Sequence, residues 1–171
     1  IVENQLTELW TNYGELFEIW FDGGCLPVEK GGPNILPLLK KYQPNAIVFQ
    51  GPKDTKSLIR WVGNENGVAP LNCWSTVLTS GNSYTGIFEE SDLCGSPYGS
   101  IWSPAECDVP LRDHKAFGGG WFWKKDEERY VHSPEYFLKL YYQSVGRNAN
   151  LLIGLVIDNR GLVPELDAKT L

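Results

Sequence analysis

The sequence lacks long apolar runs, clusters of basic residues and the glycine signatures of nucleotide-binding loops. No apolar stretch approaches the ~18 residues that cross a bilayer, so we expect no membrane partner. The net charge is −6, and Lys and Arg form no cluster, which argues against a nucleic-acid partner. Neither GxGxxG nor GxxxxGK(S/T) follows an expected strand, and this argues against a nucleotide-binding fold.

The spacing of metal-binding cysteines is also missing. None of the four cysteines stands in a CxxC pair, so we expect no metal site. Their even number is compatible with two disulfides in any of three pairings, which favours a secreted or extracellular protein. Four buried thiols would give the same sequence, so both alternatives stay open.

Aromatic residues, by contrast, are abundant. Seven Trp, eight Tyr and seven Phe make up 13% of a chain of 171 residues, a length within the range of one domain. Flat aromatic faces suit sugar rings, and they equally suit an aromatic core. With 42% hydrophobic and 21% charged residues, the composition is that of a globular protein.

Apolar periodicity predicts three helices. Residues 3–14 carry apolar side chains on one helical face, and residues 33–42 resume this pattern with Pro37 marking a kink or a late start. The clearest helix covers residues 133–146, with Ser133 as its N-cap.

Four strands are expected between and after these helices, at residues 17–21, 46–50, 101–109 and 150–157. Residues 51–100 show a weak pattern and are interpreted as a long loop region with short helical pieces. Alternation of strand and helix is the α/β signature, and polar residues that follow the strands are typical of a (β/α)8 TIM-like barrel. A complete barrel needs about 250 residues, so the chain is interpreted as the second half of one.

The stretch FEIWFDGG places Asp22 at the end of the first expected strand, just before two glycines. Asp-Gly is common turn chemistry, so Asp22 has a purely structural interpretation. A carboxylate at the carboxyl end of a barrel strand is also where this fold carries its catalytic groups.

Several motifs resemble the α-L-fucosidases of glycoside hydrolase family 29: ELFEIWFDGG, RWVGNENG, SPAECDVPLRDH, GGWFWKKDEE and NLLIGLVIDNRGLVPE. The resemblance implies that residues 1–171 are a partial (β/α)8 catalytic domain, covering strands 4 to 8, without the N-terminal strands and the C-terminal β-sandwich. It also implies hydrolysis of terminal α-L-fucose with retention of configuration, without a metal or an organic cofactor. The implied partner is a fucosylated oligosaccharide or glycoprotein glycan.

The resemblance assigns the two catalytic carboxylates. Asp22 matches the nucleophile, and Glu65 matches the acid/base of the subgroup that prefers α1,3/α1,4-linked fucose. We expect Glu65 on the loop after the strand next to that of Asp22. Adjacent strands lie ~4.8 Å apart, so the retaining separation of about 5–5.5 Å would be reachable. Glu106 is the rival for the acid role, and it is also a candidate ligand for sugar hydroxyls.

Further sugar contacts are implied at Arg60 and Trp61, by hydrogen bond and by stacking, and at Trp121, which resembles the family's aromatic wall against the fucose methyl group. Core packing is the structural interpretation of Trp121. Asp108 is interpreted as a turn or salt-bridge residue.

One feature departs from the family, because His114 and His132 do not match the sugar-binding histidines of its first barrel strands. The alternative function is a catalytically inactive fucose-binding relative or fragment. A glycosidase for another sugar is opposed by the GWFW motif. We expect the 171 residues alone to be inactive or poorly folded without the missing half of the barrel, because a half barrel leaves unpaired sheet edges.

Overall fold

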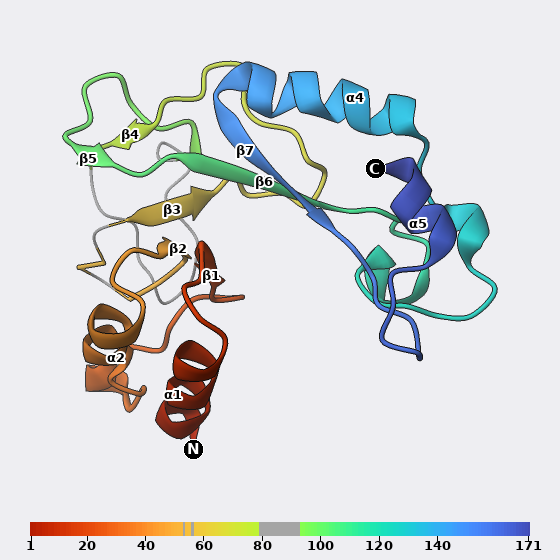
Figure 1. Ribbon diagram of the computed structural model, residues 1–171. Coiled ribbons are helices and arrows are strands. Elements are labelled where there is room, and N and C mark those ends of the chain that lie inside the picture. The colour runs from red at the N-terminus through yellow and green to blue at the C-terminus, as the bar shows by residue number, and fades with distance from the viewer. Residues whose placement is uncertain (53, 56, 79–92) are drawn as a thin grey trace. The chain divides into compact units, whose positions relative to one another are not determined.

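The computed structural model describes residues 1–52, 54–55, 57–78 and 93–171, and these fall into two units (Figure 1). The first unit comprises Ile1–Gly63 and Asn72–Ala105, and the second comprises Asn64–Leu71 and Glu106–Leu171. Within the described residues, no helix is both long and apolar enough to cross a membrane.

The first unit is built on three parallel strands in the order β1-β2-β3. Two helices lie next to each other beside these strands (Figure 1). The elements are α1 (Val2–Asn12), β1 (Glu18–Trp20), η1 (Val28–Lys30), α2 (Ile35–Tyr42), β2 (Ile47–Phe49) and β3 (Leu58–Trp61). Trp10, Ile19, Leu39 and Val48 form the centre of the core between the helices and the strands.

The strand expected at residues 101–109 is in fact two strands. β5 (Ile101–Trp102) pairs antiparallel with β4 (Thr76–Val77), whereas β6 (Ala105–Pro110) starts three residues after β5 ends. Pro104 stands between them, and it has no N–H to donate to a ladder. Its carbonyl instead accepts from the Arg60 N–H at 3.0 Å.

The second unit contains β6 and β7 (Ala149–Gly154) as neighbours, and Figure 1 shows them running in the same direction. Its helices are η2 (Phe117–Gly120), η3 (Glu128–Tyr130), α4 (Pro134–Gln143), η4 (Val145–Arg147) and α5 (Glu165–Thr170). The core is formed by Val109 and Leu111 together with Phe137 and Leu140 of α4. A strand, a helix and a parallel strand in succession confirm the α/β class.

The three predicted helices are present, with shifted ends. The Ser133 side chain accepts a hydrogen bond from the N–H of Tyr136 and caps α4 as expected. That helix ends at Gln143, before the expected Gly146, because the next turn is the 3-10 helix η4. Pro37 lies in the first turn of α2, so its effect is a late helix start.

All four cysteines lie in the described part of the chain, and all four are free thiols. Cys25, Cys73 and Cys107 are buried, and Cys94 is partly exposed. Burial raises the pKa of the Cys25 thiol to about 12. The sequence left open two disulfides or four buried thiols, and the structure has four thiols, of which three are buried.

One buried side chain connects three segments of the first unit. Gln43, the residue after α2, donates through Nε2 to the carbonyls of Trp10 (2.8 Å) and Gly14 (2.9 Å). Its Oε1 accepts from the N–H of Leu16 at 2.9 Å. Three main-chain groups at the end of α1 and before β1 thus depend on a single amide.

We predict that Gln43→Leu lowers the free energy of unfolding by about 2–3 kcal/mol, because it leaves these main-chain groups without their partner. Urea unfolding of the full-length protein measures the change. Lys40→Leu, at an exposed position of α2, is the matched control and should change stability by less than about 0.5 kcal/mol. Equal stability of the two variants would contradict the prediction.

Candidate active site

Asp22 is an exposed residue in a turn that immediately follows β1. The turn is closed by the N–H of Gly24, which donates to the Phe21 carbonyl at 2.9 Å. The Phe21 N–H donates to the carbonyl of Phe49 at 3.1 Å, which ties this end of β1 to the end of β2. Asp22 therefore projects its carboxylate to solvent from a backbone that the sheet holds in place.

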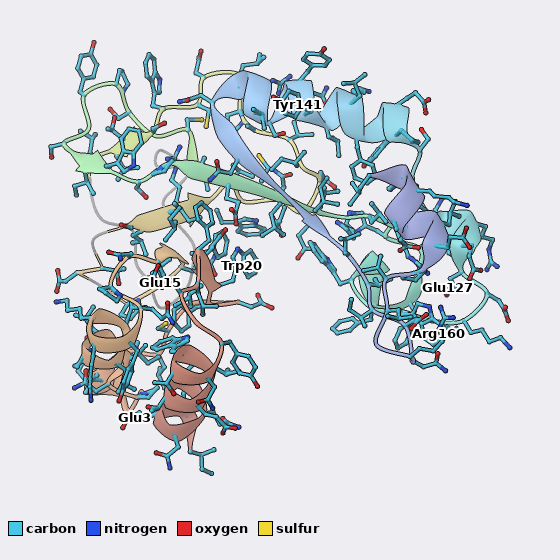
Figure 2. All side chains as sticks on the ribbon, in the orientation of Figure 1. Glu3, Glu15, Trp20, Glu127, Tyr141 and Arg160 are labelled. Atoms are coloured by element: carbon cyan, nitrogen blue, oxygen red, sulfur yellow. The ribbon has the colours of Figure 1, made fainter. Side chains whose placement is uncertain are left out.

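Trp20, which is labelled in Figure 2, lies two residues before Asp22 in the sequence. The sequence analysis did not name it as a candidate site residue. Its ring stacks on Phe49, with centroids 3.8 Å apart and an interplanar angle of 6°. Phe49 is fully buried, whereas Trp20 is 36% exposed. The pair thus presents a supported aromatic surface beside Asp22. The sequence signal that could have revealed it is a Trp two residues before a strand-end carboxylate, where strand alternation places it on the opposite face from Ile19 and Phe21.

Arg60 is fully buried in β3, and its guanidinium contacts main-chain carbonyls of distant segments. Nη2 donates to the carbonyls of Trp74 (2.8 Å) and Leu93 (3.4 Å), and Nη1 donates to that of Ser103. These bonds attach the β4–β5 ribbon to β3. Contact of Arg60 with sugar stays a prediction, and so does contact of the half-buried Trp61.

Glu65 is exposed and stands in a turn of the second unit. Asn64 shapes this turn, since its Oδ1 accepts from the N–H of Asn66 at 3.0 Å and its Nδ2 donates to the Val68 carbonyl at 3.1 Å. Gly67 has a φ of +68°, and a Cβ there would lie 3.0 Å from Leu140 Cδ1. The GNENG sequence therefore forms a defined turn, because glycine permits close packing on the core below it.

The strand that precedes Glu65 differs from the expected one. Glu65 follows β3, the second strand after β1 along the chain, and β2 lies between β1 and β3. The expectation that Glu65 follows the strand adjacent to that of Asp22 is therefore wrong. The strand at residues 58–61 was not predicted and fell in the region interpreted as loop. A four-residue strand with a central arginine gives no clear apolar pattern.

Trp121 meets Glu65 in the second unit. Its indole Nε1 donates to Glu65 Oε2 at 3.2 Å, although the two residues are 56 positions apart. The ring also packs over Gly154, the last residue of β7, where a Cβ would lie only 2.3 Å from Cζ3 of the indole. Trp121 is thus positioned by β7 and in turn orients a carboxylate.

Glu106 and Asp108 lie within β6 rather than after it, and each is only 2% exposed. The interpretation of Asp108 as a turn residue is wrong, since it stands in the middle of a strand. Its carbonyl accepts from the N–H of Gly67 at 3.0 Å, which joins β6 to the Glu65 turn. Glu106 is a buried carboxylate of the same strand.

The two histidines, His114 and His132, each contact a neighbouring residue of the second unit. His132 stacks on Tyr136 with ring centroids 3.9 Å apart, and burial lowers the pKa of its imidazole. His114 Nδ1 lies 3.1 Å from the Gly119 carbonyl. Among the described residues, no cluster of three or more His, Cys, Asp or Glu side chains could hold a metal ion.

We predict that Gly154→Ala displaces the Trp121 indole and breaks its hydrogen bond to Glu65. The added methyl group would overlap the ring, which should cost about 1–3 kcal/mol of stability. The readouts are urea unfolding and the chemical shift of the Trp121 indole N–H.

Gly146→Ala is the matched control, because a Cβ at this position would meet its nearest neighbour at an ordinary 3.8 Å. It should leave both readouts near the wild-type values. An unchanged Trp121 resonance in Gly154→Ala would refute the proposed packing.

Comparison with known proteins identifies relatives of the whole chain, although no family model matches it. Alpha-L-fucosidase 1 of Arabidopsis thaliana is 38% identical over 176 residues, which cover 98% of this chain and 32% of that protein. A crystal structure from Bacteroides thetaiotaomicron, provisionally named an α-L-fucosidase, is 36% identical with a TM-score of 0.84 and covers 98% of this chain and 38% of its own.

A glycoside hydrolase 29 family member from an unknown rumen bacterium is 30% identical with a TM-score of 0.75, over 98% of this chain and 31% of its own. The chain thus spans about a third of the length of the relatives it matches. Over nearly all of its own length, the chain is homologous to a segment of the α-L-fucosidases of glycoside hydrolase family 29.

Proposed function

We propose that this protein is a retaining exo-glycosidase that releases terminal α-L-fucose from fucosylated glycans. The observation that carries the proposal is homology to α-L-fucosidases over 98% of the chain. The exposed carboxylates of Asp22 and Glu65, each held in a defined turn, support it because a retaining glycosidase needs two carboxyl groups with separate roles.

In this mechanism Asp22 is the nucleophile. Its ionised carboxylate attacks the anomeric carbon, the glycosidic bond breaks, and a covalent fucosyl-enzyme forms. The position of Asp22 supports this role, since a short side chain just after a strand is fixed better than one in a long loop. The exposed Trp20 surface beside it adds an apolar face for the sugar.

Glu65 is the proposed acid/base. It protonates the departing oxygen in the first step and takes a proton from water in the second. The hydrogen bond from Trp121 supports this role, because it fixes one carboxylate oxygen while leaving the other available. Burial of Glu106 in β6 makes it the weaker candidate for proton transfer to a substrate in water.

The proposal extends to the linkage preference, the substrate contacts and the location of the protein. These parts rest on the GNE motif and on the glycan substrate. We propose a preference for α1,3/α1,4-linked fucose and substrate contacts by Arg60, Trp61 and Trp121. A secreted or extracellular location is also proposed for a protein that acts on glycans, although the four free thiols give it no support.

Two substitutions should separate the two catalytic roles in the full-length protein. Asp22→Gly should abolish turnover of every fucoside, and azide should restore it partly by giving the inverted β-fucosyl azide. Glu65→Ala should slow natural glycans about 10²–10⁴-fold, and nitrophenyl fucoside much less, because a good leaving group needs little protonation. Azide on this variant should give the retained α-azide. Initial rates and the configuration of the azide product are the measurements.

Glu106→Ala is the comparison variant for the acid role. If Glu106→Ala, and not Glu65→Ala, shows the dependence on the leaving group, the acid is Glu106. If wild-type protein releases nitrophenol from the matching galactoside but not from the fucoside, the proposed sugar specificity is wrong. Substantial activity of Asp22→Gly without azide would reduce Asp22 to a turn residue.

A further inference from the structure

Two of the four thiols, Cys73 and Cys94, lie on segments of the first unit that are distant in sequence and adjacent in space. The N–H of Trp74 donates to the Cys94 carbonyl at 2.8 Å. Backbone contact is also close at Gly95, since a Cβ there would lie only 2.4 Å from the Trp74 carbonyl oxygen. The residue that follows each cysteine is therefore part of the contact between the two segments.

The spacing of the two cysteines suits a disulfide. The carbonyl carbon of Cys73 is bonded to the Trp74 nitrogen, and the hydrogen bond of that nitrogen ends on the Cys94 carbonyl oxygen. Standard bond lengths then place the Cα atoms of the two cysteines within about 7 Å of each other. Disulfides usually join Cα atoms that are roughly 4.4–6.8 Å apart, so closure requires little movement of the main chain.

The Cys73 sulfur also lies on the side of its segment that faces Cys94. Cys73 Sγ is 3.8 Å from Arg60 Nη2, and the same nitrogen donates to the Leu93 carbonyl at 3.4 Å. A Cβ at Gly95 would lie 2.9 Å from this nitrogen. One guanidinium nitrogen thus lies beside the Cys73 sulfur and beside the residues that flank Cys94.

The two thiols differ in exposure in a way that suits stepwise oxidation. Cys94 is partly exposed, so a small reagent can reach it, whereas Cys73 is buried. Burial raises the pKa of the Cys73 thiol, the positive charge of Arg60 acts against this rise, and the nearby Cys94 adds to it. Such an effect of one thiol on the other is expected of groups that are close together. The Arg60 guanidinium therefore stabilises the Cys73 thiolate when it forms.

We propose that Cys73 and Cys94 form a redox-reactive dithiol, which a small disulfide of the glutathione class closes to an intramolecular disulfide. No step of the proposed hydrolysis uses either thiol, so the inference does not depend on the fucosidase assignment. The new bond cross-links two segments that now meet through hydrogen bonds. The dithiol is closed in an oxidising compartment and open in a reducing one.

The reaction proceeds by two thiol–disulfide exchanges. The Cys94 thiolate attacks one sulfur of the small disulfide, the reagent's S–S bond breaks, and one half leaves as a thiolate. The Cys73 thiolate then attacks the Cys94 sulfur and displaces the second half. The two protons of the cysteine thiols pass to the two released thiolates. The cysteines thereby lose two electrons, and the small disulfide is reduced to two thiols.

The chemical test uses the full-length protein, reduced with dithiothreitol and then exposed in its native state to oxidised glutathione. Remaining thiols are alkylated, and peptides are analysed by mass spectrometry without reduction. We expect a Cys73–Cys94 cross-linked peptide from most of the protein, which dithiothreitol removes. Glutathione retained on Cys94 beside an alkylated Cys73, or either cysteine joined to a different one, would overturn the proposal.

Cys25 and Cys107 are controls within the same sample, because both are buried. Burial also raises the pKa of the Cys25 thiol to about 12, which keeps it protonated and unreactive. Both should be recovered as thiols, protected until the protein is unfolded for digestion. Oxidation of all four cysteines to the same extent would show indiscriminate reaction and would refute a specific dithiol.

The thermal midpoint of the full-length protein tests the cross-link independently. A disulfide between residues 73 and 94 closes a loop of about 20 residues, so oxidation should raise the midpoint by about 3–8 °C, reversibly with dithiothreitol. Cys94→Ala should abolish this shift, whereas the matched control Cys25→Ala should keep it. Each shift is measured within one variant, so a general loss of stability does not affect it. A shift that persists in Cys94→Ala, or its absence from wild-type protein, would refute the cross-link.

Discussion

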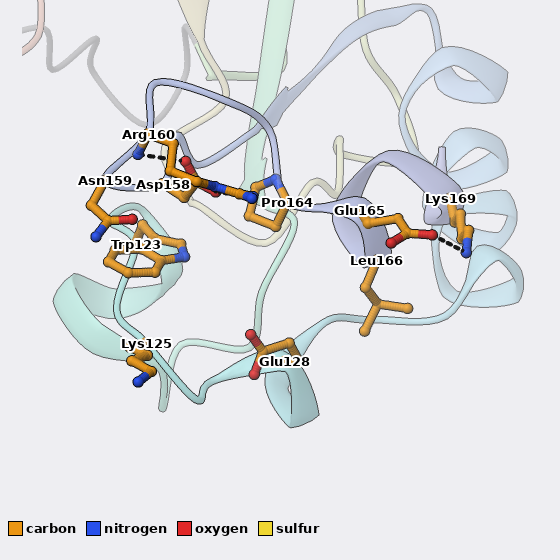
Figure 3. Close-up of a pocket in the computed structure, with 10 residues that line it drawn as sticks. All are labelled: Trp123, Lys125, Glu128, Asp158, Asn159, Arg160, Pro164, Glu165, Leu166 and Lys169. Carbon is orange, nitrogen blue, oxygen red and sulfur yellow. Dashed lines mark hydrogen bonds and ion pairs between the residues drawn. The ribbon is translucent and has the colours of Figure 1, made fainter.

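The ion pair between Arg112 and Asp167 is the contact on which the second unit depends. Arg112 Nε lies 3.1 Å from Asp167 Oδ2, Nη2 lies 2.8 Å from Oδ1, and neither side chain is exposed to solvent. Removing one partner of such a pair leaves an uncompensated buried charge, which typically costs about 3–5 kcal/mol. The pair joins Arg112, two residues after the end of β6, to α5, a helix of six residues that could not persist alone. Since Glu165, Leu166 and Lys169 of α5 line a cavity of about 620 Å³ (Figure 3), the pair also fixes that part of the cavity wall.

The sequence predicted those helices and strands that are specified by their own residues and close neighbours in the chain. The N-cap Ser133 and the strand that leads to Asp22 were expected from their own residues, and both were confirmed. β3 was missed because its central Arg60 resembles a surface residue until the carbonyls that surround it are known. The helix α5 was missed for a similar reason, since it owes its place to a partner 55 positions away.

In the candidate site, too, short motifs identified single residues, whereas contacts between residues far apart in the sequence could not be predicted. Motifs identified Asp22, Glu65 and Trp121, but no pattern in the sequence predicts that the Trp121 indole bonds to Glu65. Counting strands from apolar runs placed Glu65 one strand too early. Glu106 was expected as a rival acid or a ligand of sugar hydroxyls and Asp108 as a turn or salt-bridge residue, and both are buried within β6.

The buried guanidinium of Arg60 has a consequence for how its substitution must be interpreted. Its hydrogen bonds reach main-chain carbonyls on either side of the β4–β5 ribbon, at Trp74 and Ser103. A lysine there would offer one nitrogen where the arginine offers a planar fork. An Arg60 variant would therefore release the ribbon whether or not the residue also contacts fucose. Loss of activity at this position would measure the integrity of the scaffold, and only a bound sugar seen directly against Arg60 could assign it to recognition.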